Sequence, residues 1–197
     1  MLTVTMTDQT TARTWLHQPE HWREAGDTLT ATAPPGTDYW RVTHYGFIHD
    51  NGPFRYQQRS GNFEAKVRVA AKYHELYHHA GLMIRIDDQN WIKAGIELLN
   101  GKQSVGAVVT REFSDWSVLP LADDPAFLWL RLQRFHDTVQ VSHSRDNQRW
   151  SMIRLAYFPP QVTVSIGMMA AAPGKQALEV TFDHFSITPL DSPPKED

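Results

Sequence analysis

The chain has 197 residues, of which 41% are hydrophobic and 11% aromatic, and its formal net charge at pH 7 is −3. This length is enough for one domain with a substantial core. The sequence contains no run of Lys and Arg, which argues against a nucleic-acid partner because phosphates are neutralised by clustered basic residues. It contains no Cys, which excludes disulfides, thiolate catalysis and cysteine-ligated zinc.

The two ends of the chain are polar, and the apolar stretches lie between them. We expect a flexible N-terminus over residues 1–14, a single β-sandwich domain over residues 15–190 and a flexible tail over residues 191–197. The first residues lack the basic start and apolar run of a secretory signal. No stretch reaches the ~18 apolar residues of a membrane span. These features predict a cytoplasmic protein with no membrane partner.

Short apolar stretches separated by turn residues fill the middle of the chain. Residues 63–69, with the sequence FEAKVRV, alternate apolar and charged side chains and predict a half-buried strand. Residues 82–87 and 91–98 show the same alternation. The Asn-Gly pair at 100–101 is a strong hairpin signal before the next strand at residues 105–111.

The second half of the chain continues the pattern. Residues 128–133, 139–141, 162–168 and 178–187 are apolar or alternating stretches separated by turn residues. Strands that recur about every ten residues are typical of a sandwich or a barrel. No amphipathic helix of twelve or more residues is apparent. The sequence therefore predicts an all-β domain.

Five segments carry a family resemblance: HYGFI at residues 44–48, GNFE at 61–64, AGLMIR at 80–85, NWIKAGIE at 90–97 and TREFSDWS at 110–117. They resemble the regulation-of-enolase protein family, over roughly residues 15–190 of this chain. The resemblance implies a concanavalin-A-like jelly-roll sandwich of two antiparallel sheets, one of them concave. It implies no cofactor and no defined reaction, because this fold carries lectins, glycoside hydrolases and binding modules alike.

Charged side chains fall opposite the apolar faces of several predicted strands. If these strands are neighbours, Glu64, Arg85, Lys93 and Glu97 share one polar sheet face, to which Lys66 and Arg68 also belong. A sugar site needs such polar groups together with aromatic platforms. The alternative is a solvated sheet face with cross-strand ion pairs, each worth ~0.2–1 kcal/mol. The ligand-binding candidates are Tyr45, Tyr77, Arg85, Trp91, Lys93, Glu97, Arg111 and Trp116.

Two of these acids suggest a catalytic alternative. Glu64 and Glu97 are expected on the same face, and a glycosidase needs two carboxyl groups about 5–5.5 Å apart for retention or about 6.5–9.5 Å apart for inversion. Hydrolases of this fold usually carry two acids close together on one strand, and Glu97 has no such neighbour. The glycoside hydrolase using Glu97 and Glu64 stays an alternative to a binding module.

The segment at residues 111–117, with the sequence REFSDWS, allows two interpretations. In the first, Arg111 and Trp116 lie at the rim of the concave site. In the second, the segment is a corner between strands, in which Asp115 caps a turn and Trp116 packs onto the core.

The sequence HELYH at residues 74–78 matches the H-E-x-x-H zinc-protease motif. That chemistry requires a helix, which places both His side chains on one face and a Glu beside the metal. Only about ten residues separate the flanking predicted strands, too few for the helix. We therefore expect a His-rich loop and no metal site.

Together these patterns predict a module that binds a carbohydrate or a similar polar small molecule on its concave sheet, without a cofactor. The glycoside hydrolase and a regulatory protein-interaction module acting on metabolism are the alternatives, the latter with a protein partner.

Overall fold

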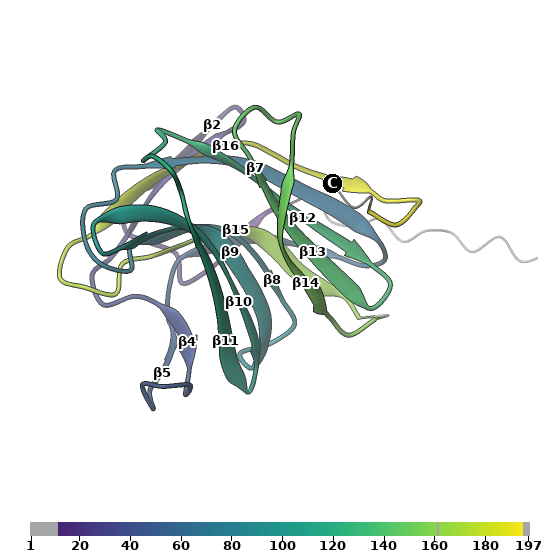
Figure 1. The fold of residues 1–197 in the computed structure, drawn as a ribbon, viewed down its shortest axis with the longest axis horizontal. Coiled ribbons are helices and arrows are strands. Elements are labelled where there is room, and N and C mark those ends of the chain that lie inside the picture. The colour runs from purple at the N-terminus through teal and green to yellow at the C-terminus, as the bar shows by residue number, and fades with distance from the viewer. Residues whose placement is uncertain (1–11, 161, 195–197) are drawn as a thin grey trace, which may run out of the picture.

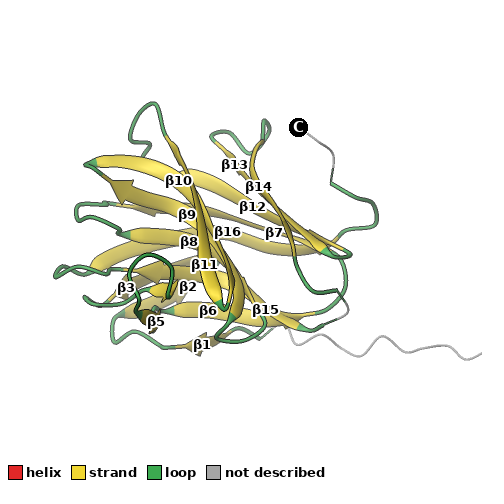
Figure 2. Ribbon diagram, turned by 60° about the horizontal axis from the view of Figure 1, so that its bottom comes forward, coloured by secondary structure: helices red, strands yellow, loops and turns green. Residues whose placement is uncertain are grey.

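The computed structural model describes residues 12–160 and 162–194. All secondary-structure elements in these ranges are β-strands, as Figure 2 shows, so the predicted all-β class is confirmed. No helix of the described ranges is long and apolar enough to cross a membrane. Residues 1–11 and 195–197 of the two predicted flexible ends lie outside the described residues, and strand β1 already begins at Thr14.

Two seven-stranded antiparallel sheets form the fold (Figure 1). The order of the first sheet is β1-β6-β15-β8-β9-β10-β11, and that of the second is β14-β13-β12-β7-β16-β3-β2. A separate hairpin consists of β4 and β5. The strands of the described residues are β1 (Thr14–Leu16), β2 (Trp22–Ala25), β3 (Thr28–Ala33), β4 (Tyr39–Arg41), β5 (Ile48–Asp50), β6 (Phe54–Arg59), β7 (Phe63–Ala71), β8 (His79–Arg85), β9 (Asn90–Leu99), β10 (Lys102–Arg111), β11 (Phe113–Pro120), β12 (Leu128–Phe135), β13 (Thr138–Ser144), β14 (Ser151–Tyr157), β15 (Val164–Ala171) and β16 (Leu178–Pro189).

The core lies between the two sheets, where their apolar faces meet. Alternate residues of each strand point inward because the side-chain period of a strand is two. On β7 these are Phe63, Ala65, Val67 and Val69, all buried, which confirms the predicted face. The inward residues of β8, β9 and β12 are Ala80, Leu82, Ile84, Ile92, Ala94, Ile96, Leu128, Leu130 and Leu132.

A second apolar cluster covers the outer face of the first sheet, the face turned away from the core. Tyr39 and Trp40 of β4 pack there against Met83, Trp91 and neighbouring residues of the sheet. The Tyr39 and Trp91 rings meet edge to face with centroids 6.0 Å apart. The β4–β5 hairpin is therefore packed on the first sheet and does not extend freely into solvent.

Residues 111–117 form an edge hairpin. Arg111 pairs with Phe113 across a tight turn at Glu112, whose φ is 60°. The prediction of a corner capped by Asp115 is wrong, because Asp115 lies within β11 and forms an ion pair with Arg154 of the second sheet. After the ten residues of β10, this turn reverses the chain, which continues as β11, the edge strand of the first sheet.

Candidate functional site

A cavity of about 290 Å³ opens between the outer face of the first sheet and the β4–β5 hairpin. Strands β9, β10 and β11 supply one side of it, and the hairpin with its tip supplies the other. Its aromatic lining residues are Trp40, Tyr45, Phe47, Tyr77 and Trp116. Its ionisable polar lining residues are Asp38, His49, Lys93 and Glu97.

Three glycines lie together in the first sheet, next to the strand residues that line this cavity. Gly81, Gly95 and Gly106 lie opposite one another on the adjacent strands β8, β9 and β10. A Cβ at Gly95 would lie only 2.1 Å from the Ala80 carbonyl oxygen, so the strands approach too closely there for any side chain. Gly95 falls between Lys93 and Glu97 on the same face of β9, and no side chain therefore separates these two residues along the strand.

Four aromatic residues form a closed circuit around the cavity, which we call the aromatic cage: Trp40, Tyr45, Tyr77 and Trp116. The Trp40 ring meets Tyr45 at 5.7 Å and 72°, and it meets Trp116 at 6.5 Å and 90°. Trp116 in turn meets Tyr77 at 6.5 Å and 76°. The hydroxyl groups of Tyr45 and Tyr77 lie 3.2 Å apart and close the circuit. Phe47, another lining residue, stacks on Tyr45 with centroids 5.2 Å apart.

The backbone that carries the cage tyrosines is strained. At the tip of the β4–β5 hairpin, Val42 and His44 have φ values of 60° and 65°. A β-branched residue such as Val rarely adopts this conformation. The tip is held by a hydrogen bond from the Val42 amide to the Phe47 carbonyl, with N and O 2.7 Å apart. Tyr77 itself has a φ of 66°. Such strain clusters at ligand clamps and active sites, where the surrounding structure maintains it.

Lys93 and Glu97 of β9, together with Asp38, form the polar floor of the cavity. Lys93 is 3% exposed, and its Nζ lies 3.0 Å from Oδ1 of Asp38, which precedes β4. Glu97 is 7% exposed, and its Oε2 has no hydrogen-bond partner within the described ranges. Burial raises the pKa of Glu97 to about 7, although the neighbouring Lys93 and the Trp116 indole act to lower it. The floor thus contains one neutralised ion pair and one acid poised near neutral pH.

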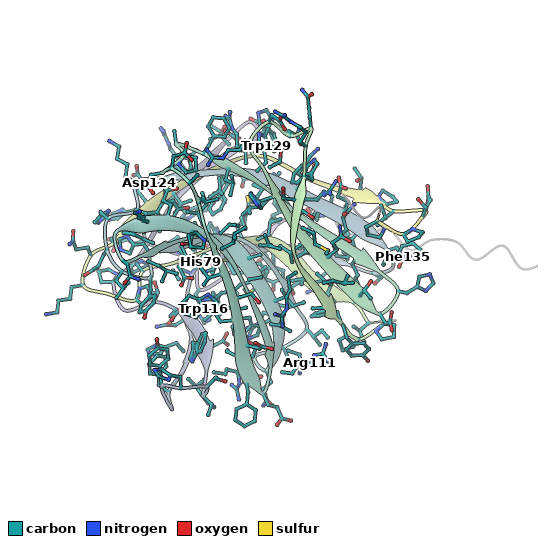
Figure 3. All side chains as sticks on the ribbon, viewed as in Figure 1. His79, Arg111, Trp116, Asp124, Trp129 and Phe135 are labelled. Carbon is teal, nitrogen blue, oxygen red and sulfur yellow. The ribbon has the colours of Figure 1, made fainter. Side chains whose placement is uncertain are left out.

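A buried histidine lies beside this floor. His79 of β8 is directly opposite Glu97, and its Nε2 lies 2.8 Å from the position that a Cβ would take at Gly95. Neither ring nitrogen has a hydrogen-bond partner among the residues that the structure describes. Burial, aided by the Lys93 charge, holds the pKa of His79 well below its usual value, so the imidazole is neutral. Figure 3 labels His79 and Trp116 in the same region of the first sheet.

The structure brings together five of the eight ligand-binding candidates: Tyr45, Tyr77, Lys93, Glu97 and Trp116 all line the cavity. The other three lie elsewhere. Arg85 binds Asp50 with both guanidinium nitrogens, at 2.6 and 2.8 Å, beneath the β4–β5 hairpin. Trp91 is fully buried in the outer apolar cluster.

Arg111 lies at the far end of the β10–β11 hairpin, away from Trp116 (Figure 3). Its guanidinium carbon is 4.4 Å from the centre of the Tyr157 ring, and it donates a hydrogen bond to the Tyr157 carbonyl. The Arg111 side chain thus connects the first sheet to β14, the edge strand of the second sheet.

The expectation that Glu64 and Glu97 share a face is wrong. Glu64 belongs to β7 in the second sheet, where Gln133 donates a hydrogen bond to its Oε2 at 3.0 Å. Its strand neighbours Phe63 and Ala65 point into the core, so Glu64 points outward from the second sheet. Glu97 points outward from the first sheet, and the whole core separates the two carboxylates. Lys66 and Arg68 lie with Glu64, and the carboxylate that accompanies Glu97 at the cavity is Asp38.

The segment at residues 74–78 is a loop before β8. Glu75 accepts a hydrogen bond from the Gln176 amide at 2.7 Å, and His78 is buried with Nε2 3.1 Å from the Gln176 carbonyl oxygen. Through these contacts, Glu75 and His78 hold the loop that carries Tyr77 against the backbone of Gln176. Within the described ranges, no group of three His, Asp or Glu residues is arranged to hold a metal ion.

Sequence reasoning missed Asp38, Trp40, Phe47 and His49, which reach the cavity from the β4–β5 hairpin and its flank. Strands of three residues are too short for an alternation pattern to identify. A signal was nevertheless available, since residues 39–56 are rich in aromatic side chains and include the HYGFI segment.

Comparisons with known proteins agree with this fold. A yeast protein, Regulation of enolase protein 1 of Saccharomyces cerevisiae, is 37% identical over 175 residues, covering 89% of this chain and 88% of its own. A crystal structure of a functionally unknown protein from Saccharomyces cerevisiae superposes with a TM-score of 0.88 at 36% identity, covering 91% of this chain and 97% of that chain.

More distant structures share the fold alone. The Bacteroides ovatus xyloglucan-locus protein GH43B gives a TM-score of 0.71 at 19% identity over 94% of this chain and 38% of that chain. The carbohydrate-binding module CBM66 from Bacillus subtilis gives 0.57 at 12% identity over 88% of this chain and 94% of that chain.

These neighbours confirm the expected two-sheet jelly-roll sandwich, and the yeast relative confirms the resemblance to the regulation-of-enolase proteins. The profile of a family described as "Protein of unknown function (DUF1349)" matches residues 15–190. This chain therefore belongs to that family, together with its regulation-of-enolase relatives.

Proposed function

We propose that this protein binds a carbohydrate or a similarly polar small molecule in the cavity beneath the β4–β5 hairpin. The observation that carries the proposal is the combination of an aromatic cage with the polar floor of Asp38, Lys93 and Glu97 around one cavity. Aromatic rings contact the apolar C–H groups of a sugar, while charged groups form directional hydrogen bonds with its hydroxyls.

The size of the cavity limits its ligand. A volume of about 290 Å³ lies just below the roughly 300–1,000 Å³ that is usual for small-molecule sites. This favours one sugar ring, or a molecule of that size, over a long glycan lying across an open sheet. The fold similarity to a carbohydrate-binding module is consistent with such a ligand, although similarity at 12% identity concerns the fold alone.

Binding is favoured over glycoside hydrolysis by the position of the acids. A general acid and a second carboxylate must lie on either side of one scissile bond. Glu64 is on the outer face of the opposite sheet and is therefore unsuited to act with Glu97. Asp38 is the other cavity carboxylate, and it is already ion-paired with Lys93.

Calorimetric titration of the protein with monosaccharides and short oligosaccharides tests this proposal. We expect saturable binding of at least one sugar, and a loss of about tenfold or more in affinity for Trp116→Ala, since truncating an aromatic residue at the centre of a binding site commonly costs about 2 kcal/mol or more. Phe113→Ala is the matched control, because Phe113 is an exposed aromatic residue of the same strand outside the cavity lining. Absence of binding at millimolar sugar, or equal loss in both variants, would contradict the proposal.

A further inference from the structure

We infer that the ligand of this cavity carries an ammonium group, which lies within the aromatic cage with Glu97 as its counter-ion. The inference rests on the proposed function and names the ligand class: an amino sugar or another small organic cation. It goes beyond general sugar binding, because a neutral sugar does not need a buried carboxyl group with an oxygen that lacks a hydrogen-bond partner.

The arrangement of the rings supports a cage for a compact group. The Trp40 ring meets Tyr45 at an interplanar angle of 72° and Trp116 at 90°. Tyr77 meets Trp116 at 76°. Rings at such steep angles form the walls of a pocket that can surround a compact group. A cation is attracted to an aromatic ring within about 6 Å of its centroid. Neighbouring centroids are 5.7–6.5 Å apart, so a cation between the walls interacts with several rings at once.

The charges of the floor support a cation as well. Lys93 is balanced by Asp38, with Nζ and Oδ1 3.0 Å apart. Glu97 is the remaining acid of the cavity lining, and its Oε2 is buried without a hydrogen-bond partner among the described residues. A buried polar group without a partner is costly, and a charged one more so. An ammonium group supplies both the hydrogen-bond donor and the opposite charge.

Protonation should be coupled to this binding. The pKa of Glu97 is raised to about 7 because the carboxyl group is buried, so part of the population is protonated at neutral pH. A cation in the cage favours the carboxylate and releases that proton. The other titratable or charged groups that line the cavity or lie beside Glu97 are Asp38, Tyr45, His49, Tyr77, His79 and Lys93.

The test compares cations with neutral molecules of the same shape. Choline is paired with 3,3-dimethylbutan-1-ol, and glucosamine with glucose, in calorimetric titrations of the full chain at pH 7, where the glucosamine amine is still mostly protonated and Glu97 is partly ionised. We expect each cation to bind about tenfold or more tightly than its neutral counterpart, and the better of the two cations separates a methylated ammonium from an amino sugar. Choline keeps its charge at every pH, so its affinity should rise from pH 5.5 to pH 8.5 as Glu97 ionises.

Two variants assign the preference to residues. Glu97→Gln should abolish both the preference for cations over their neutral counterparts and the pH dependence of choline binding, which separates the effect of Glu97 from that of the histidines at the cavity. Tyr77→Leu should weaken choline binding without changing the pH dependence, because it removes one wall and keeps the acid. Circular dichroism checks that each variant is folded.

Each outcome bears on the inference. Equal affinity for cation and neutral counterpart, or no binding of choline and glucosamine, overturns it. If neutral sugars bind nonetheless, the proposed function stands and only the inference fails. If neither the sugars nor the cations and their neutral counterparts bind, the proposed function and the inference both fail.

Discussion

The hydroxyl groups of Tyr45 and Tyr77 lie 3.2 Å apart, although 32 positions separate these residues in the sequence. Tyr45 lies at the tip of the β4–β5 hairpin, and Tyr77 lies in the loop before β8. Their contact joins two loops that each contain residues with positive φ, and it closes the aromatic cage over the cavity.

Removing one hydroxyl should loosen this closure. The hydrogen bond with Tyr45 is the main reason why the pKa of Tyr77 is raised to about 12. In Tyr77→Phe we expect the hairpin tip to open more readily by about 0.5 kcal/mol, which doubles the rate of amide hydrogen exchange at residues 42–47. Tyr157→Phe, on the edge strand β14, is the control. Unchanged exchange at the tip in Tyr77→Phe would show that the hydroxyl pair does not hold the cage closed.

The ion pair between Arg85 and Asp50 should anchor the hairpin to the first sheet. Arg85 is 8% exposed, and its two guanidinium nitrogens bind the Asp50 carboxylate at 2.6 and 2.8 Å. Arg85→Met leaves Asp50 without its partner, so we expect a loss of about 3 kcal/mol in unfolding free energy, measured by urea denaturation. Arg149→Met removes an exposed Arg from its pair with Asp146 and should change stability far less. Similar losses in the two variants would contradict the anchoring role.

The paired glycines of β8, β9 and β10 predict a contrast in stability between two substitutions. A Cβ at Gly95 would lie 2.1 Å from the Ala80 carbonyl oxygen, so Gly95→Ala must separate β8 from β9. We expect a loss of about 3 kcal/mol or more in unfolding free energy. At Gly106, on the same face of the next strand, the nearest atom is the Ser117 carbonyl oxygen at 3.2 Å, so Gly106→Ala should cost much less. Thermal unfolding of both variants measures the difference; equal midpoints would rule out the close approach.

Glu97 should make stability depend on pH near neutrality. Its pKa is about 7 in the folded protein against an ordinary value of 4.5, so folding favours the protonated acid. The stability that this group contributes is complete below pH 4.5 and is lost as the pH rises through 7. Gln does not ionise, so the variant Glu97→Gln does not lose this stability. The unfolding free energy of the variant minus that of the wild type should therefore rise by about 2–3 kcal/mol between pH 5 and pH 8.

Glu75→Gln is the opposite control for that experiment. Backbone hydrogen bonds from Gln176 and Lys175 hold the pKa of Glu75 below its usual value, so its contribution is present at pH 8 and lost in acid. The relative stability of Glu75→Gln should therefore fall as the pH rises from acid to neutral. Urea denaturation across the pH range measures both variants. A flat profile for Glu97→Gln relative to the wild type would exclude a raised pKa at Glu97.

The sequence by itself determined the all-β class and the inward face of several long strands, among them β7, β8, β9 and β12. Residues 63–69 and 91–98 alternate with a period of two. Burial follows that alternation in residues 63–69, where only one face meets the core, whereas residues 91–98 are buried on both faces because the outer apolar cluster covers the second one. The same pattern placed Lys93 and Glu97 together on the outward face of one strand, since they are four residues apart.

Only the tertiary structure decided which outward faces belong together. Alternation shows that Glu64 and Glu97 point away from the core, but it carries no information on the sheet to which each strand is added, and the structure places them on opposite sides of the molecule. It also decided that the β4–β5 hairpin covers the first sheet, which buries Arg85 and Trp91 and brings Asp38 and Trp40 to the cavity. Both outcomes depend on contacts between residues far apart in the chain, and a local pattern of side chains does not encode them.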